Sequence, residues 1–290
     1  MNWIGFLTIF VALIIVISFI TSISYEIKSG GTFWFNFFDK SSRQSNYFIS
    51  LSPFVFLICI WYLLSYSSYV DKAYLPTPNS VVSELWIMLS SGDIFSNIAT
   101  SLLRIVIAFS LASVVGFLLG SLAGTFTKFH SLIIPLNSSL RYIPPTAFIS
   151  LTIIWFGIQE AGKIALIYIG VVFYITQMIS DVVKLVPRIY IEAAQMLGAN
   201  RYEIFKKIIL AYTMPEVLSV LRVNLGAAWT FLIVAELVAA QRGIGYLMAI
   251  SQRFLQTPKL FALIFIVGFL GFASDFIFGR LIKYVSRWKP

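Results

Sequence analysis

The chain has 290 residues, of which 59% are hydrophobic and 11% are charged, and its formal net charge is +9. This composition excludes a soluble globular domain, because apolar runs of about 20 residues, long enough to cross a bilayer as a helix, recur along the whole length. The positive charge indicates membrane orientation rather than nucleic-acid binding, since the basic residues stand at the ends of the apolar runs.

The apolar runs are predicted as helices, because backbone groups in lipid must hydrogen-bond within their own segment. The predicted spans are Trp3–Ser22, Ile49–Tyr69, Ile98–Thr125, Leu132–Phe156, Ile164–Val186, Val217–Ala240 and Leu260–Tyr284. The first has no basic residue before it and no clear cleavage site after it, so we expect a retained helix, with a processed or peripheral segment as the alternative. The fold class is an all-α integral membrane protein, with an N-terminal helix and polar linker over residues 1–48 and a membrane domain over residues 49–290.

Lysine and arginine residues are more numerous on one side of the membrane that the predicted spans cross. With the loop around Glu192 in the cytoplasm, the cytoplasmic side collects Lys28, Lys40, Arg43, Lys128, Arg141, Lys184, Arg188, Arg201, Lys206, Lys207, Arg280, Lys283, Arg287 and Lys289. The other side holds Lys72, Lys163, Arg242, Arg253 and Lys259. This bias predicts that Met1 is external and Pro290 cytoplasmic, with Asp71–Asn97 as an external segment that contains a short helix over Val81–Leu89.

Two features of the central spans concern helix packing and shape. Ala112, Gly116, Gly120 and Gly124 recur at every fourth residue, a pattern that lets another helix approach closely. We expect this packing inside one subunit rather than at a dimer seam. Pro144 and Pro145 must break or kink the predicted fourth span, either to line a translocation pathway or as a purely structural bend.

Two further patterns are not expected to carry chemistry. Gly157 and Gly162-Lys163 have the spacing of a phosphate-binding P-loop, but Ile164 stands where Ser or Thr should meet Mg²⁺, and no strand precedes them. The lone His130 offers neither a metal cluster nor a catalytic triad. We therefore expect no catalytic residue and no metal site in this chain.

Polar side chains inside membrane spans are functional candidates, because they are costly in lipid. They are Arg104, Gln177, Asp181, Arg222, Asn224, Glu236 and Asp275. The charged ones are predicted near span ends, where pairing or snorkelling accounts for them. Gln177 and Asn224 are predicted deeper, so they join Pro144 and Pro145 as candidates for lining a pathway.

The loop over residues 187–211 is a polar island between two apolar spans. Ile189–Leu197 is predicted as a short helix that ends at Gly198, where a left-handed conformation is needed. Asn200 and Glu203 have the spacing of a capping box that starts a second, amphipathic helix. The unit is suited to present a rigid knob to a partner; an ordinary surface helix that only anchors the protein is the alternative.

These residues resemble a known family. Glu192-Ala193-Ala194, three residues, Gly198 and then nine residues to Ile208 is similar to the signature of permease subunits of bacterial ATP-binding-cassette (ABC) importers. Leu75-Pro76-Thr77-Pro78, Arg141-Tyr142-Ile143-Pro144-Pro145, Trp155-Phe156-Gly157 and the run Ala239–Tyr246 resemble the nitrate, sulfonate, taurine and bicarbonate branch. The chain departs from the family where Ala211 follows Leu210 in place of proline, and in its extra N-terminal span, since the family core has six.

The resemblance implies a permease that forms the translocation pathway for a small oxyanion or organic anion in the bacterial cytoplasmic membrane. Glu192, Ala193, Ala194 and Gly198 would then form the coupling loop that docks on a separate ATPase, which binds the ATP and Mg²⁺. Further implied partners are a second permease copy and an external or lipid-anchored solute-binding protein. Two alternatives are kept, a single-chain secondary carrier or channel without a soluble motor and a membrane scaffold or sensor.

Overall fold

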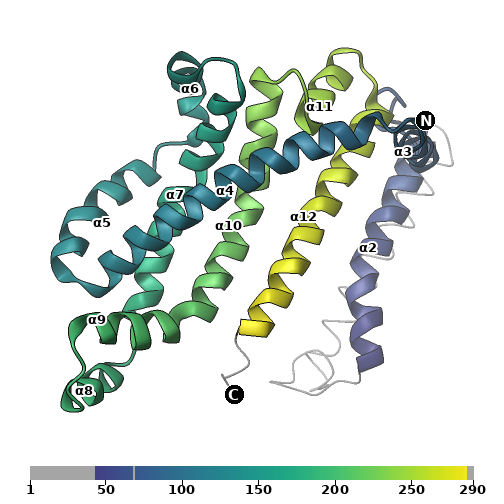
Figure 1. The fold of residues 1–290 in the computed structure, drawn as a ribbon. Coiled ribbons are helices and arrows are strands. Elements are labelled where there is room, and N and C mark those ends of the chain that lie inside the picture. The colour runs from purple at the N-terminus through teal and green to yellow at the C-terminus, as the bar shows by residue number, and fades with distance from the viewer. Residues whose placement is uncertain (1–42, 68, 286–290) are drawn as a thin grey trace. The chain divides into compact units, whose positions relative to one another are not determined.

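A computed structural model describes residues 43–67 and 69–285 (Figure 1). Within these residues the chain is helical and contains no strand. The elements are α2 (Arg43–Tyr66), α3 (Pro78–Ser91), α4 (Asp93–Thr125), α5 (Thr127–Arg141), η1 (Pro145–Phe148), α6 (Ile149–Phe156), α7 (Glu160–Lys184), α8 (Arg188–Met196), α9 (Arg201–Glu203), η2 (Ile204–Ile209), α10 (Leu210–Ala239), α11 (Ile244–Arg253) and α12 (Thr257–Val285). The predicted span Trp3–Ser22 lies outside the described residues.

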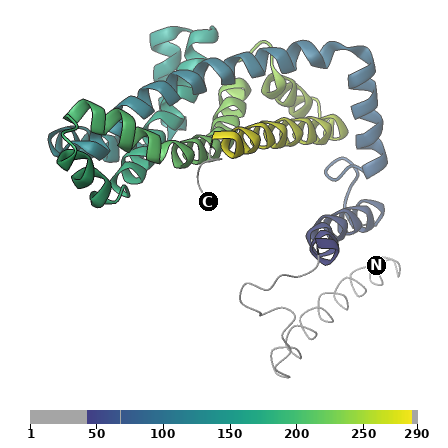
Figure 2. The ribbon, with the colours of Figure 1, turned by 60° about the horizontal axis from the view of Figure 1, so that its bottom comes forward.

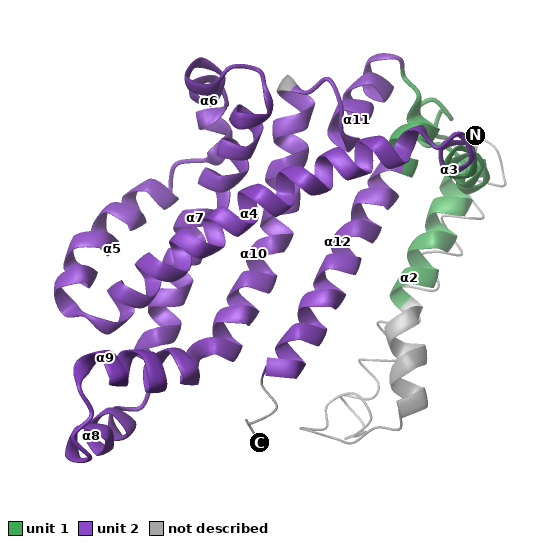
Figure 3. Ribbon diagram, in the orientation of Figure 1, with its two compact units in different colours: residues 1–86, 255–262 green, residues 87–254, 263–290 purple. Residues whose placement is uncertain are grey.

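The chain divides into two compact units (Figure 3). The described residues up to Trp86, with Leu255–Ala262, form the first, and Ile87–Phe254 with the rest of α12 form the second. In the first unit Trp61 of α2 donates a hydrogen bond to the carbonyl of Pro76 at 3.0 Å and stacks on Phe261. The candidate functional residues all lie in the second unit.

Four helices among the described residues are long and apolar enough to cross a membrane: Asp93–Thr125, Glu160–Lys184, Arg201–Val238 and Thr257–Val285. They correspond to the predicted spans that begin at Ile98, Ile164, Val217 and Leu260. The short helix predicted over Val81–Leu89 is also confirmed, because α3 covers these residues and extends beyond them at both ends.

The predicted fourth span, Leu132–Phe156, is wrong as one continuous helix. α5 ends at Arg141, and the 3₁₀ helix η1 leads into the short helix α6, which ends at Phe156. Pro144 has an extended backbone (φ −57°, ψ 129°) and precedes Pro145, which lacks an N–H group. Because two successive prolines cannot sustain the hydrogen bonds of a helix, the expected break is confirmed.

The predicted start of the sixth span, Val217, is also wrong. A π-helical segment, η2, joins α9 directly to α10, so that the helical stretch Arg201–Val238 comprises 38 residues. The loop's second helix and the membrane span are therefore one continuous rod. Ala211 keeps the backbone N–H that a proline would lose, and the helix tolerates Pro215 one turn later.

The core of the second unit lies where α4 crosses α7 and α10 (Figures 1 and 2). A methyl group built on Gly116 would stand 2.6 Å from Cγ2 of Ile175 of α7. On Gly120 or Gly124 it would lie 2.7 Å from the carbonyl oxygens of Thr176 and Ser180, respectively. Because backbone cannot yield at that distance, the glycines are required for close packing within this chain, as predicted.

Candidate functional site

The loop after α7 begins with the short helix α8. Pro187 precedes it, and α8 starts and ends one residue before the predicted bounds. Gly198 has φ +82°, so the expected left-handed conformation is confirmed. Its N–H donates to the carbonyl of Gln195, and the N–H of Ala199 donates to that of Ala194, both at 3.0 Å. These two bonds form a Schellman motif, which turns the chain sharply at the end of α8.

The start of α9 is held by the capping box that the sequence predicts. The Asn200 side chain accepts a hydrogen bond from the Glu203 N–H at 2.9 Å, and the Glu203 carboxylate accepts one from the Asn200 N–H at 3.1 Å. Lys207 then pairs with Glu203 at 3.1 Å on an exposed surface. Both ends of the short connection between α8 and α9 are therefore fixed by local hydrogen bonds.

One face of α8 is packed, and the other lies open. Ala194 is buried in the same cluster as Ile204 and Ile209 of η2, so a larger side chain would push α8 away. Glu192 and Ala193 are exposed, and Met196 and Leu197 keep 90% and 88% of their surface. An open groove beside them is lined by Tyr190, Ala193, Ala194, Leu197, Lys207, Ile208, Ala211 and Tyr212. The four predicted loop residues therefore lie together on a projection that also carries exposed apolar side chains.

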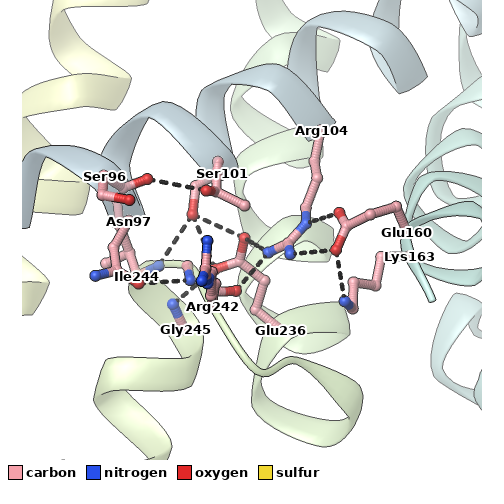
Figure 4. A network of polar contacts seen from close by, with 12 residues as sticks. Ser96, Asn97, Ser101, Arg104, Glu160, Lys163, Glu236, Arg242, Ile244 and Gly245 are labelled. Carbon is pink, nitrogen blue, oxygen red and sulfur yellow. Dashed lines mark hydrogen bonds and ion pairs between the residues drawn. The ribbon is translucent and has the colours of Figure 1, made fainter. Parts of the chain in front are cut away.

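A second cluster of polar residues lies at the opposite end of α7, where α4, α7 and α10 meet (Figure 4). Arg104 is 1% exposed, and its Nη1 donates to Glu236 of α10 at 2.6 Å. Its Nε and Nη2 donate to the two carboxylate oxygens of Glu160 at 2.5 and 2.7 Å. Lys163 pairs with Glu160 at 2.9 Å. Two cations and two carboxylates therefore neutralise one another among three helices.

The turn between α10 and α11 is built around the same carboxylate. Glu236 accepts hydrogen bonds from the Ser101 hydroxyl at 2.7 Å and the Gly245 N–H at 2.8 Å. Gly243 has φ +119°, and a methyl group on it would lie 2.5 Å from Cδ of Glu236. The Arg242 carbonyl accepts from Nη1 of Arg104 at 2.7 Å. Glycine is therefore required where this backbone passes over the buried ion pair.

The charged residues in the spans were expected near span ends, either paired or snorkelling. The structure shows pairing, but the placement near a span end is wrong for Arg222. Arg222 of α10 and Asp275 of α12 form a bidentate ion pair, with both hydrogen bonds at 2.5 Å. The helical stretch that contains α10 begins at Arg201, well before the predicted Val217, so Arg222 lies inside it. α12 extends the predicted span Leu260–Tyr284 by only three residues at its start and one at its end. The Arg104–Glu160 pair was not predicted. In the sequence, Lys163 is interpreted as part of a chance P-loop match and Glu160 is not singled out, although an acid and a base three residues apart lie there at the start of α7.

The structure does not bring the pathway candidates into one site. Asn224 is buried, and its amide donates to the Val220 carbonyl of its own helix at 2.9 Å. Gln177 donates to Asp181 one turn further along α7 at 3.2 Å. Pro144 and Pro145 lie at the break between α5 and α6. Within the described residues, no group of three or more His, Cys, Asp or Glu side chains is placed to hold a metal ion.

Comparisons with known proteins agree with this architecture. Residues 112–287 match the family described as the binding-protein-dependent transport system inner membrane component. The chain is 30% identical to the taurine transport system permease protein TauC of Escherichia coli (strain K12), over 85% of this chain and 91% of that protein. It is 31% identical to the putative aliphatic sulfonates transport permease protein SsuC of Bacillus subtilis (strain 168), over 80% and 84%. It is 27% identical to the nitrate import permease protein NrtB of Synechococcus elongatus, over 82% and 92%.

Among solved structures, the fold is similar to a chain of the inward-facing MetNI methionine ABC transporter. The TM-score is 0.56 at 18% identity, and the match covers 70% of this chain and 98% of that one. This likeness concerns the fold alone. Together with the family match and the permease relatives, it shows that the chain is a multi-pass inner membrane protein of the binding-protein-dependent transport family, an ABC importer permease of the branch that includes taurine, sulfonate and nitrate permeases.

Proposed function

We propose that this permease forms the translocation pathway of an importer that a separate cytoplasmic ATPase drives by alternating access, with the loop over residues 187–211 as the coupling element. The observation that carries the proposal is the α8 projection, fixed at its base by the Schellman motif and the capping box. Its exposed Met196 and Leu197 favour binding by a partner protein outside the membrane, because large apolar side chains clustered on a projection favour burial.

The connection from α8 to α10 gives this coupling a mechanical basis. α8 packs on η2, and η2 continues into α10 without a break. A displacement of α8 by a docked ATPase is therefore transmitted to a membrane-spanning rod rather than absorbed by a flexible linker. Glu192 supplies the polar anchor on the exposed side of α8, and Ala193 and Ala194 keep the helix slim enough to pack on η2 and enter a groove.

The assembly that we propose has two copies of this permease, two ATPase subunits and an external solute-binding protein. One docking loop cannot engage both halves of a symmetric ATPase dimer, which favours the permease homodimer. ATP and Mg²⁺ would bind to the ATPase, and this chain would carry no cofactor. Residues 49–290 would form the permease domain, and residues 1–48 an additional N-terminal segment. Native mass spectrometry of the purified complex should give two copies of this chain.

The proposed substrate class is a small oxyanion or organic anion, such as nitrate, a sulfonate or bicarbonate. The names of the relatives support this class, since they include taurine, aliphatic sulfonate and nitrate permeases. Gln177, Asn224, Pro144 and Pro145 remain the candidates of this chain for the pathway. Uptake of each anion by proteoliposomes that contain the complete transporter would identify the substrate.

The coupling proposal is tested with Glu192→Ala and Gly198→Val. The first change removes a charge-assisted contact worth about 1.5–3 kcal/mol, and the second strains a left-handed backbone by about 1–3 kcal/mol. Both variants should insert and fold, yet lose substrate-stimulated ATP hydrolysis and uptake in proteoliposomes. Gly198→Asn is the matched control, since asparagine tolerates this conformation and should retain coupling. Full coupled uptake by the double variant would show that the loop does not transmit the motion.

The orientation is tested by cysteine labelling in a Cys59→Ser background. A membrane-impermeant reagent added from outside should modify Asn79→Cys and spare Asn200→Cys, because the lysine and arginine bias puts residue 200 in the cytoplasm. Disruption of the membrane should make position 200 reactive and so controls for burial. The reverse pattern would overturn the orientation and, with it, the docking of a cytoplasmic ATPase on α8.

A further inference from the structure

A cavity of about 600 Å³ lies beside the buried charge network, at the end of α7 opposite to α8. Its polar lining comes from α4 (Thr100 and Arg104), the α6–α7 turn and the first turn of α7 (Gln159, Glu160 and Lys163), and the α10–α11 turn (Gln241 and Arg242). Figure 4 shows Glu160 and Lys163 on one side of the Arg104 guanidinium group and Arg242 on the other. Three segments that are distant in the sequence therefore converge on one polar space.

The cavity wall holds hydrogen-bond donors that the protein does not use. Lys163 is 6% exposed, and its ammonium group has three N–H donors. Among the described residues it has one acceptor, Glu160, at 2.9 Å. A buried ammonium group with unused donors is costly unless water or an anion accepts from it. The side chain thus points to an acceptor that enters the cavity from outside the protein.

The charge around the cavity is unbalanced. Arg104, Lys163 and Arg242 are cationic, while Glu160 is the carboxylate in the wall and Glu236 lies behind Arg104. Arg104 is occupied by the two carboxylates and a carbonyl. Arg242 is exposed and forms no ion pair within the described part of the chain. One cation therefore remains without a counter-charge, and the amides of Gln159 and Gln241 can add neutral donors beside it.

We propose that this cavity binds an oxyanion group, such as a sulfonate, nitrate or carboxylate, between Lys163 and Arg242. Glu160 is the resident counter-ion of Arg104 and Lys163, and its carboxylate weakens the attraction of the cavity for an incoming oxyanion. If the oxyanion belongs to the transported solute, the inference rests on the proposed function and makes this a subsite of the permease outside the α8 loop. A lipid phosphate group offers the same chemistry and is the second source to be tested.

The test is the melting temperature of the purified permease in dodecyl maltoside, a detergent without phosphate. Sodium nitrate or sodium phosphate replaces sodium chloride at constant ionic strength, and taurine, a zwitterion, is added at constant sodium chloride. We expect a saturable rise with at least one oxyanion. Arg242→Gln should raise the half-maximal concentration roughly tenfold, because it removes a charge-assisted contact. Glu160→Gln should lower that concentration, because it removes the competing carboxylate, whereas a purely structural Glu160 would only lower the melting temperature. Lys184→Gln, at the other end of α7, is the matched control and should behave like the unchanged chain.

The lipid source is distinguished by adding short-chain phosphatidylglycerol. If a headgroup fills the cavity, the lipid raises the melting temperature more in the unchanged chain than in Arg242→Gln, and free anions then add nothing. The site would be overturned if neither anions nor the lipid raised the melting temperature, or if Arg242→Gln left that rise unchanged. Because no ATPase or binding protein is present, this result is independent of whether the α8 loop couples transport.

A second measurement does not depend on stability. The measurement is the labelling rate of an introduced cysteine in a Cys59→Ser background, with a sulfonate-bearing and with a cationic thiosulfonate reagent. At Gln241→Cys, in the cavity wall, the ratio of the anionic to the cationic rate should be about tenfold higher than at the exposed Asn79→Cys. Taurine or nitrate should slow the labelling at position 241. The proposal would be overturned if the rate ratios were equal at the two positions and neither taurine nor nitrate slowed the labelling.

Discussion

The buried network around Arg104 and the exposed loop around α8 use charge in opposite ways. In the network, Arg104 and Glu236 are each about 1% exposed, and their partners come from three helices. In the loop, Glu203 and Lys207 pair in solvent, one turn apart on the same helix. The charges of the network hold helices of one chain together. In the loop, the polar groups shape a projection, and apolar side chains remain exposed.

The difference separates residues that build the permease from residues that we propose connect it to a motor. Glycine serves both regions for different reasons. Gly243 lets the backbone pass over Glu236, where any side chain would collide. Gly198 has no atom near its missing side chain, so the backbone conformation alone requires glycine there. Substitutions should therefore reduce stability in the first region and coupling in the second.

The largest effect is expected from Arg104→Met, which leaves the Glu236 carboxylate buried without a cation. Removal of one partner from a buried ion pair costs about 3–5 kcal/mol. The free energy of unfolding in mixed detergent–dodecyl sulfate micelles measures this cost. Lys207→Gln, which breaks the exposed pair in the loop, should cost less than about 1 kcal/mol. Similar costs for the two variants would contradict the contrast between the regions.

An intermediate effect is expected where α4 meets α7. Gly120→Ala and Gly124→Ala each place a methyl group 2.7 Å from a backbone oxygen of α7, so the helices must separate, at a cost of about 1–3 kcal/mol. Gly226→Ala in α10 is the matched control, since a methyl group there meets nothing within 4 Å. The same unfolding assay measures all three. A destabilised Gly226→Ala together with unaffected α4 variants would place the close approach elsewhere, for example between two copies.

The smallest effect is expected at the capping box. Asn200→Ala removes the acceptor for the Glu203 N–H and should cost about 1 kcal/mol. Asn200→Ser keeps a capping oxygen and should restore most of that stability, as measured by thermal unfolding. Because the cap aims α8 relative to α10, Asn200→Ala should also lower coupled uptake more than Lys207→Gln does. Equal uptake by the two variants would indicate that the cap does not contribute to coupling.

Features that depend on hydrogen bonds between near neighbours were predictable from the sequence. The Gly198 turn and the Asn200–Glu203 capping box join residues within five positions of one another, so residue types at fixed spacing identify them. The long apolar runs and the break at Pro144 and Pro145 were equally readable, because lipid demands helices and successive prolines interrupt them. The start of the α10 rod was less predictable, because the polar residues between Arg201 and Pro215 conceal that the helix continues from the loop into the apolar run.

By itself, the sequence determined the membrane class, most of the helices and the local geometry of the α8 loop, since these follow from composition and short-range spacing. Tertiary structure alone decided which charges pair. Arg104 meets Glu160 and Glu236 across 56 and 132 positions of the chain, and Arg222 meets Asp275 across 53. Every acid and base in the spans needs a partner, but many pairings satisfy that need. The packing of the helices on one another selects among them, because it fixes which side chains lie within hydrogen-bond distance.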